Sequence, residues 1–260
     1  MSADFTNIHF RVVNSRLRLA ASGSVPRVAR PRYPKQQGPL PPPLPPETRT
    51  VGQLVAETVR LYGARFLPVL ALGLSIAALD ETSLGRSPNE QTVVLWLFTP
   101  LVTASYIGAC ALVAEERPPL RALLGGLAVG IVVWLPVPGL LHFYLVPAVA
   151  WLALLGLAVP AAVIERRGFV DSFRRGLELA RADFVHAFGS LAALAIVYFL
   201  SRTVLLFLLR TQSDNAIRTA GFLADLVLSP LLFVGAAMLF VDQAARVRSS
   251  KASTSTTTPA

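Results

Sequence analysis

The feature that most constrains this chain is a run of 43 residues, 122–164, that contains no Asp, Glu, Lys or Arg. A single helix of that length would measure about 64 Å, roughly twice the ~30 Å hydrocarbon core of a bilayer. Pro136, Pro138 and Gly139 interrupt the run, and such residues favour a turn. The run therefore predicts two membrane-spanning helices joined by a tight turn at 136–139.

The composition of the whole chain supports the same interpretation. Hydrophobic residues make up 53% of the chain and charged residues only 15%, whereas soluble domains contain about 25% charged residues. Other apolar stretches predict four more spans, at 66–79, 91–114, 184–209 and 219–241. The predicted fold class is all-α, an integral membrane helical bundle of about six transmembrane helices with two interfacial amphipathic helices.

The first and third predicted spans are short. Each offers roughly 14 uncharged residues, fewer than the ~17 that a perpendicular span requires. A re-entrant or tilted surface segment is therefore an alternative for both. We favour spanning because Arg65 and Arg121 lie at the span ends, where long side chains can extend to the interface.

The distribution of basic residues favours one orientation. With the amino terminus inside, the inner segments hold 20 Lys and Arg, and the outer loops hold three, Arg86, Arg210 and Arg218. Because Lys and Arg accumulate on the cytoplasmic side, we expect both termini to be cytoplasmic. The same distribution accounts for the net charge of +9, so we expect no nucleic-acid partner. The chain has 22 Arg and only two Lys, which suggests a GC-rich bacterial genome and hence the inner membrane of a bacterial cell.

Composition divides the chain into three zones. Residues 1–48 are basic and rich in proline and predict a disordered tail, residues 49–248 hold the spans, and the Ser/Thr-rich residues 249–260 predict a second disordered tail. The run from Pro41 to Pro46 suits a polyproline II segment that docks a protein partner. A solvated spacer or an over-extended start is the interpretation that we favour for this tail.

Two stretches have the pattern of helices that lie on the membrane surface. In 169–184, Phe169, Val170, Phe173 and Leu177 recur at helical spacing, with charged residues on the other face; a weaker version occupies 51–62. The arginines in or beside the first stretch are expected to contact membrane lipids, anionic ones in particular. These are Arg166, Arg167, Arg174, Arg175 and Arg181. Simple anchoring is favoured over the gating of a lateral opening and over the recruitment of anionic lipid.

In and just before this stretch stand Glu165, Gly168, Ser172, Arg175 and Leu179. The pattern of these five residues resembles that of a bacterial membrane-protein family, which includes the membrane domain attached to some glycerophosphoryl diester phosphodiesterases and many stand-alone multipass proteins. Gly176 and Leu177 depart from the family pattern, which usually has Ser and often an aromatic residue there. The resemblance covers about residues 50–248 and implies a family without an established activity. The phosphodiesterase chemistry of the fused relatives lies in a separate soluble barrel, so the resemblance implies no catalytic residue.

The residues offer no catalytic or metal-binding constellation. His9, His142 and His186 lack metal-ligand spacing, the single cysteine is Cys110, and neither a nucleophile motif nor a phosphate-binding loop occurs. We therefore expect no enzyme activity, no cofactor and no metal.

Arg202 and Asp225 are the charged residues within the predicted spans. They lie eight residues before Arg210 and seven after Arg218, which places them ~12 and ~10 Å below the same loop on adjacent helices. An ion pair is therefore expected, and a role in fixing helix register is favoured over a substrate or proton path. The leading hypothesis is a non-enzymatic membrane protein that organises lipid or partner proteins. The alternative is a small transporter or permease with a site near this pair.

Overall fold

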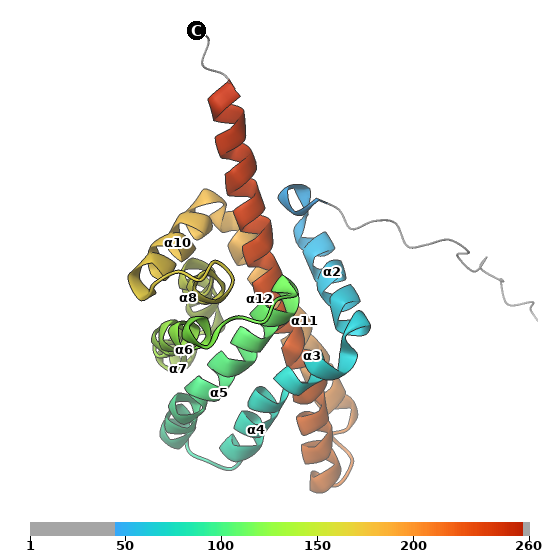
Figure 1. Cartoon of the computed structure of the whole chain (residues 1–260). Helices are drawn as coiled ribbons and strands as arrows, with labels where there is room; N and C mark the ends of the chain where they lie inside the picture. Colours follow the sequence, from blue (N-terminus) through green and yellow to red (C-terminus); the bar gives the residue numbers. More distant parts are fainter. Residues whose placement is uncertain (1–44, 257–260) are drawn as a thin grey trace, which may run out of the picture. The chain divides into compact units, whose positions relative to one another are not determined.

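The structure, a computed structural model, describes residues 45–256 (Figure 1). These residues form helices and no strand, which confirms the predicted all-α bundle. The proline run that begins at Pro41 and most of the predicted tail 1–48 lie outside the described residues.

Six segments of the described chain are long and apolar enough to cross a membrane, and they define a multipass membrane protein. The first and third, predicted to be short, have 18 and 22 residues, within the ~17 to 25 residues that a span requires. The segments are Phe66–Ser83, Pro88–Ala114, Leu120–Leu141, Leu145–Val163, Phe184–Leu208 and Asp214–Lys251.

Several of these spans are built from two consecutive helices. The elements are, in chain order, η1 (Pro46–Thr48), α2 (Val51–Ala64), α3 (Phe66–Leu72), α4 (Leu74–Ser83), α5 (Pro88–Ala114), α6 (Leu120–Trp134), α7 (Val137–Phe143), α8 (Leu145–Leu155), α9 (Ala158–Val163), α10 (Phe169–Ala182), α11 (Phe184–Leu208) and α12 (Asp214–Thr256).

The two ends of the bundle carry different elements. Figure 1 shows the α4–α5 and α11–α12 connections at one end, and α2, α10 and the end of α12 at the opposite end. We call the first the mouth end and the second the α10 end. At the mouth end, the Ser87 side chain and Glu90 form a capping box with Pro88 in the first turn, which fixes the start of α5.

The chain reverses at Tyr144, and the turn predicted at Pro136–Gly139 is wrong. Leu135 and Pro136 keep helical dihedral angles between α6 and α7, and Pro138 lies in the first turn of α7. Proline is tolerated there because the first helical residues have no intrahelical partner for their N–H groups. Tyr144, with φ −176° and ψ 162°, is extended and separates α7 from α8.

Both predicted tails contain helical residues at their inner boundaries. Pro46–Thr48 form η1, which packs on α12. At the other terminus, α12 continues through Thr256, so the segment predicted to be disordered from 249 is helical over 249–256. Ser and Thr are weak helix formers, but here they extend a helix that the preceding residues have already nucleated.

The first and sixth spans approach each other closely at Gly73, which separates α3 from α4. Pro230 lies inside α12 and has no N–H, so the carbonyl of Leu226 lacks its helical donor. A Cβ atom at Gly73 would lie 2.0 Å from that carbonyl oxygen. The absence of a side chain at Gly73 therefore permits this contact.

Candidate functional site

A cavity of about 410 Å³ lies between the spans, within the ~300 to 1,000 Å³ typical of small-molecule sites. On α5 its lining residues follow one helix face, at Gln91, Leu95, Thr99, Val102 and Tyr106. From Gln91 to Tyr106 these residues extend ~22 Å along the helix axis. The cavity therefore extends along the bundle rather than across it.

The two ends of the cavity differ in polarity. At the deep end, the Tyr106 hydroxyl donates a hydrogen bond to the Gly156 carbonyl (3.2 Å). Toward the mouth end, the lining includes exposed Gln91 and half-buried Asp80 and Ser83. The walls between are mainly Leu, Val, Ala and aromatic residues. A ligand would therefore meet apolar walls along its length and polar groups at one end.

Arg202 and Asp225 contact each other beside this cavity. Arg202 Nε donates to Asp225 Oδ1 (2.8 Å), and Arg202 Nη2 donates to Asp80 Oδ2 (2.5 Å). The Tyr198 hydroxyl donates to the same Asp225 oxygen (2.6 Å). We call Asp80, Tyr198, Arg202 and Asp225 the mouth network; Asp80 and Tyr198 line the cavity.

The mouth network combines two carboxylates with one guanidinium. The Asp225 side chain is fully buried, and its Oδ2 has no hydrogen-bond partner among the described residues. With both carboxylates and the guanidinium ionised, and with Tyr198 neutral, the formal charge of the network is one negative unit. Such an arrangement inside a membrane bundle is typical of a functional site or of helix-register control.

The sequence-based interpretation missed Asp80 and Tyr198. The predicted first span ended at Leu79, so Asp80 was assigned to a loop, but α4 continues to Ser83. One signal was available for Tyr198, because it lies four residues before Arg202 and therefore on the same helix face.

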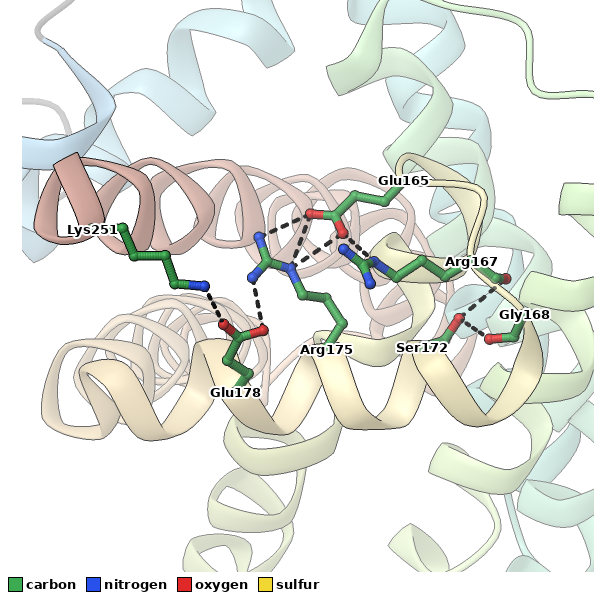
Figure 2. A network of polar contacts seen from close by, with 7 residues as sticks. All are labelled: Glu165, Arg167, Gly168, Ser172, Arg175, Glu178 and Lys251. Carbon is green, nitrogen blue, oxygen red and sulfur yellow. Dashed lines mark hydrogen bonds and ion pairs between the residues drawn. The ribbon is translucent and has the colours of Figure 1, made fainter. Parts of the chain in front are cut away.

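The arginines predicted to contact lipid do not all face outward, and Arg175 corrects that prediction. Figure 2 shows Arg175 turned toward Glu165, with Arg175 Nε 3.1 and 3.2 Å from the two carboxylate oxygens. Its Nη1 lies 2.9 Å from Glu178, and its side chain is only 10% exposed. Burial lowers the pKa of Arg175, but the hydrogen bonds and charges of the two glutamates outweigh burial and raise it.

Glu178 connects α10 to the end of α12. It accepts hydrogen bonds from Arg175 and from Lys251 (3.0 Å). These hydrogen bonds lower the pKa of Glu178 below its ordinary value, against a smaller opposing effect of burial. Figure 2 shows both contacts on the side of α10 that faces α12.

The other four arginines are more exposed. Arg166 pairs with Glu116 (2.8 Å) and Arg167 pairs with Glu165 (2.5 Å). Arg174 and Arg181 are exposed and have no ion pair within the part of the chain that the structure describes. The large apolar residues Phe169 and Val170 are exposed on the same helix.

The buried face of α10 differs from the predicted apolar face. Its buried residues are Ser172, Gly176, Leu179 and Ala180. A Cβ atom at Gly176 would lie 2.6 Å from the backbone nitrogen of Ala158, so α10 packs closely on the start of α9. The helix therefore buries its small residues against protein and exposes part of its apolar side.

The five residues that fit the family pattern contribute contacts within this region. Glu165 pairs with Arg175, and the Ser172 hydroxyl donates to the carbonyl oxygens of Gly168 (2.8 Å) and Arg167 (3.3 Å) (Figure 2). Leu179 is completely buried. These contacts hold the 164–168 connection against α10.

A second polar cluster lies at the α10 end. Arg49 Nη1 donates to Asp242 Oδ1 (2.9 Å), and both side chains are nearly inaccessible. Arg246 donates to Asp183 (2.9 Å) and to the Arg49 carbonyl (2.5 Å). The cluster joins the start of α2, the start of α11 and α12. The sequence-based interpretation missed it because the predicted sixth span ended at 241.

The fold and the cavity together define the class of this protein: a multipass membrane protein whose helical bundle contains an apolar cavity. Within residues 45–256, no group of three or more His, Cys, Asp or Glu residues could hold a metal ion. Comparison of the chain with protein-family models, with curated proteins and with solved structures gives no match.

Proposed function

We propose that this protein is a non-enzymatic membrane protein that binds the hydrocarbon chain of a lipid or another amphiphile between its spans and so organises lipid in the bilayer. The observation that carries the proposal is the apolar cavity of about 410 Å³. Ordered water requires polar partners, and most of the lining offers none. Hydrocarbon is therefore the matching occupant.

The dimensions of the cavity support the same proposal. Its lining along α5 covers ~22 Å, whereas one leaflet contributes about half of a hydrocarbon core of ~30 Å. One acyl chain therefore fits along the bundle.

The surface of α10 supports an additional contact with anionic head groups. Phe169 and Val170 are exposed, and Arg174 and Arg181 are exposed on the same helix. An interfacial helix with these properties inserts apolar side chains and attracts anionic lipid, at about 1 kcal/mol for each basic residue near the surface. Arg166 and Arg167 add to this basic surface, and Arg175 does not.

The proposed location is the cytoplasmic membrane of a bacterium, with both termini in the cytoplasm. The inner segments hold 20 Lys and Arg and the outer loops hold three, which supports this orientation. A relation to the membrane domain of glycerophosphoryl diester phosphodiesterases is part of the proposal, and it rests on the pattern from Glu165 to Leu179. A protein partner for the run from Pro41 to Pro46 stays a prediction.

A small transporter or permease is the second candidate. One observation favours it: Asp80 and Tyr198 line the cavity and also hold Arg202 and Asp225. Intramembrane ionisable groups beside a cavity are typical of substrate or ion pathways.

Lipid bound to the purified protein tests the leading proposal. Native mass spectrometry after gentle detergent exchange should show about one lipid retained by each chain. Ala148→Phe and Ala195→Phe, which place a ring at lining positions, should reduce that retention.

Ala71→Phe is the matched control, because Ala71 is exposed on α3 and does not line the cavity. It should retain lipid like the unmodified chain. Loss of all lipid from the unmodified chain, or undiminished retention by both filled-cavity variants, would contradict lipid binding in the cavity.

A further inference from the structure

We propose that the cavity selects amphiphiles with a cationic head group, which binds at Asp80. The inference deepens the proposed function, since it assigns the chemical class of the cavity's ligand. It rests on the charge of the lining, on the contacts of Arg202 and on the aromatic residues of the lining.

The lining carries a formal negative charge and no formal positive charge. Asp80 is its acidic residue, and neither Arg nor Lys lines the cavity within the described chain. An anionic head group would therefore meet a carboxylate without a lining cation to balance it. Buried or half-buried charges without a partner are unfavourable, so the lining excludes anions and admits cations.

Arg202 does not provide the missing positive charge. Its Nε binds Asp225 and its Nη2 binds Asp80, so its guanidinium is already balanced by two carboxylates. The mouth network retains one negative unit after this pairing. Of the two carboxylates, Asp80 lines the cavity and is the one that a cationic ligand can reach.

Asp80 is accessible enough to bind such a ligand. Its side chain is 36% exposed, in contrast to Asp225, which is fully buried. Arg202 engages Asp80 Oδ2, which leaves Oδ1 for a further donor, because an ionised carboxylate has about four acceptor sites. A charge-assisted hydrogen bond from an ammonium group is the matching contact.

Aromatic rings in the lining favour the same head group. Tyr198 and Phe199 both line the cavity, and their rings meet edge to face with centroids 4.9 Å apart. Tyr198 belongs to the mouth network. Aromatic faces attract organic cations, quaternary ammonium groups included. The lining therefore combines a carboxylate and aromatic rings with apolar walls for the hydrocarbon chain.

Three probes with the same alkyl chain test the inference: hexadecyltrimethylammonium, hexadecanol and hexadecanoate. Binding to the full chain in nanodiscs is measured as the excess over empty nanodiscs. We expect the cation to bind about tenfold more tightly than the alcohol, and the carboxylate to bind most weakly.

Asp80→Asn should lower the affinity for the cation about tenfold and leave the affinity for the alcohol unchanged. Glu81→Gln is the matched control, because Glu81 is the next residue on α4, pairs with Arg218 and does not line the cavity. It should bind all three probes like the unmodified chain.

The outcomes separate the two proposals. Equal binding of the three probes to the unmodified chain would overturn the cationic selectivity and leave lipid binding intact. Absence of excess binding for every probe would count against the cavity as a ligand site. If Asp80→Asn fails to fold, the order of the three probes on the unmodified chain still decides. If Asp80→Asn folds, an equal loss of affinity for the cation in Glu81→Gln would reject the assignment to Asp80.

Discussion

Arg174 and Arg175 are adjacent in sequence and have opposite surroundings. Arg174 is exposed, whereas Arg175 is held by Glu165 and Glu178. Periodicity placed both on one polar face, because a helical pattern distinguishes polar from apolar sides but does not identify which polar side chain meets a buried partner. The identity of that partner depends on how the 164–168 connection folds back.

Arg175→Ala should destabilise the protein by about 2 kcal/mol, because it removes hydrogen bonds between charged groups in a largely buried setting and leaves Glu165 without this partner. Arg174→Ala is the matched control and should change stability by less than about 0.5 kcal/mol. Thermal unfolding in detergent, followed by tryptophan fluorescence, measures both. Equal melting temperatures for the two variants would contradict the structural role of Arg175.

Glu178 predicts a specific response to acid. Hydrogen bonds from Arg175 and Lys251 lower its pKa in the folded protein below the ordinary 4.5. Its contribution to stability is therefore present above pH 4.5 and is lost as the pH falls through the lowered value. The melting temperature of the unmodified chain should fall more steeply below pH 4.5 than that of Glu178→Gln. Parallel curves for the two proteins would show that Glu178 does not contribute.

The candidate site was partly predictable at the level of single residues. Arg202 and Asp225 could be paired from their distances to one loop, because helix rise converts sequence separation into depth. Asp80 comes from a helix more than 100 residues away in sequence, and no local pattern specifies that contact. The cavity depends on the packing of all the spans and leaves no signal in any one of them.

Among the helices, α10 depends on glycine for its position. Gly176→Ala should destabilise the protein by about 3 kcal/mol, since the added Cβ atom would meet the Ala158 backbone and force α10 away from α9. Gly125→Ala is the matched control, because a Cβ atom there has nothing within 4 Å. It should leave stability unchanged or raise it by about 0.5 kcal/mol. Thermal unfolding compares them, and similar losses in both would reject the packing argument.

Apolar runs predicted the existence of the helices better than their ends. A span must be apolar only where it meets lipid, so polar residues such as Thr82 and Ser83 continue α4 after the hydrophobic signal stops. Proline has opposite effects at two positions. Inside a helix it kinks or ends the helix, whereas in the first turn it favours the start of one. That ambiguity explains why the turn was predicted at 136–139, whereas the chain reverses at Tyr144.

For the molecule as a whole, labelling of single cysteines tests the proposed orientation. Cys110 is completely buried, so the native thiol should give little background. Gln212→Cys lies in the connection before α12 and Ser249→Cys lies near the α10 end, both at exposed positions. A membrane-impermeant maleimide should label the first on intact cells and the second only after permeabilisation. The reverse pattern would overturn the assignment of the termini to the cytoplasm.

The contact between Gly73 and Leu226 has a mechanical consequence. From Leu226, α12 extends eight residues to Arg218 and 25 residues to Lys251, or about 12 Å and about 38 Å. A rigid tilt of α12 about this contact would therefore move Lys251 roughly three times as far as Arg218.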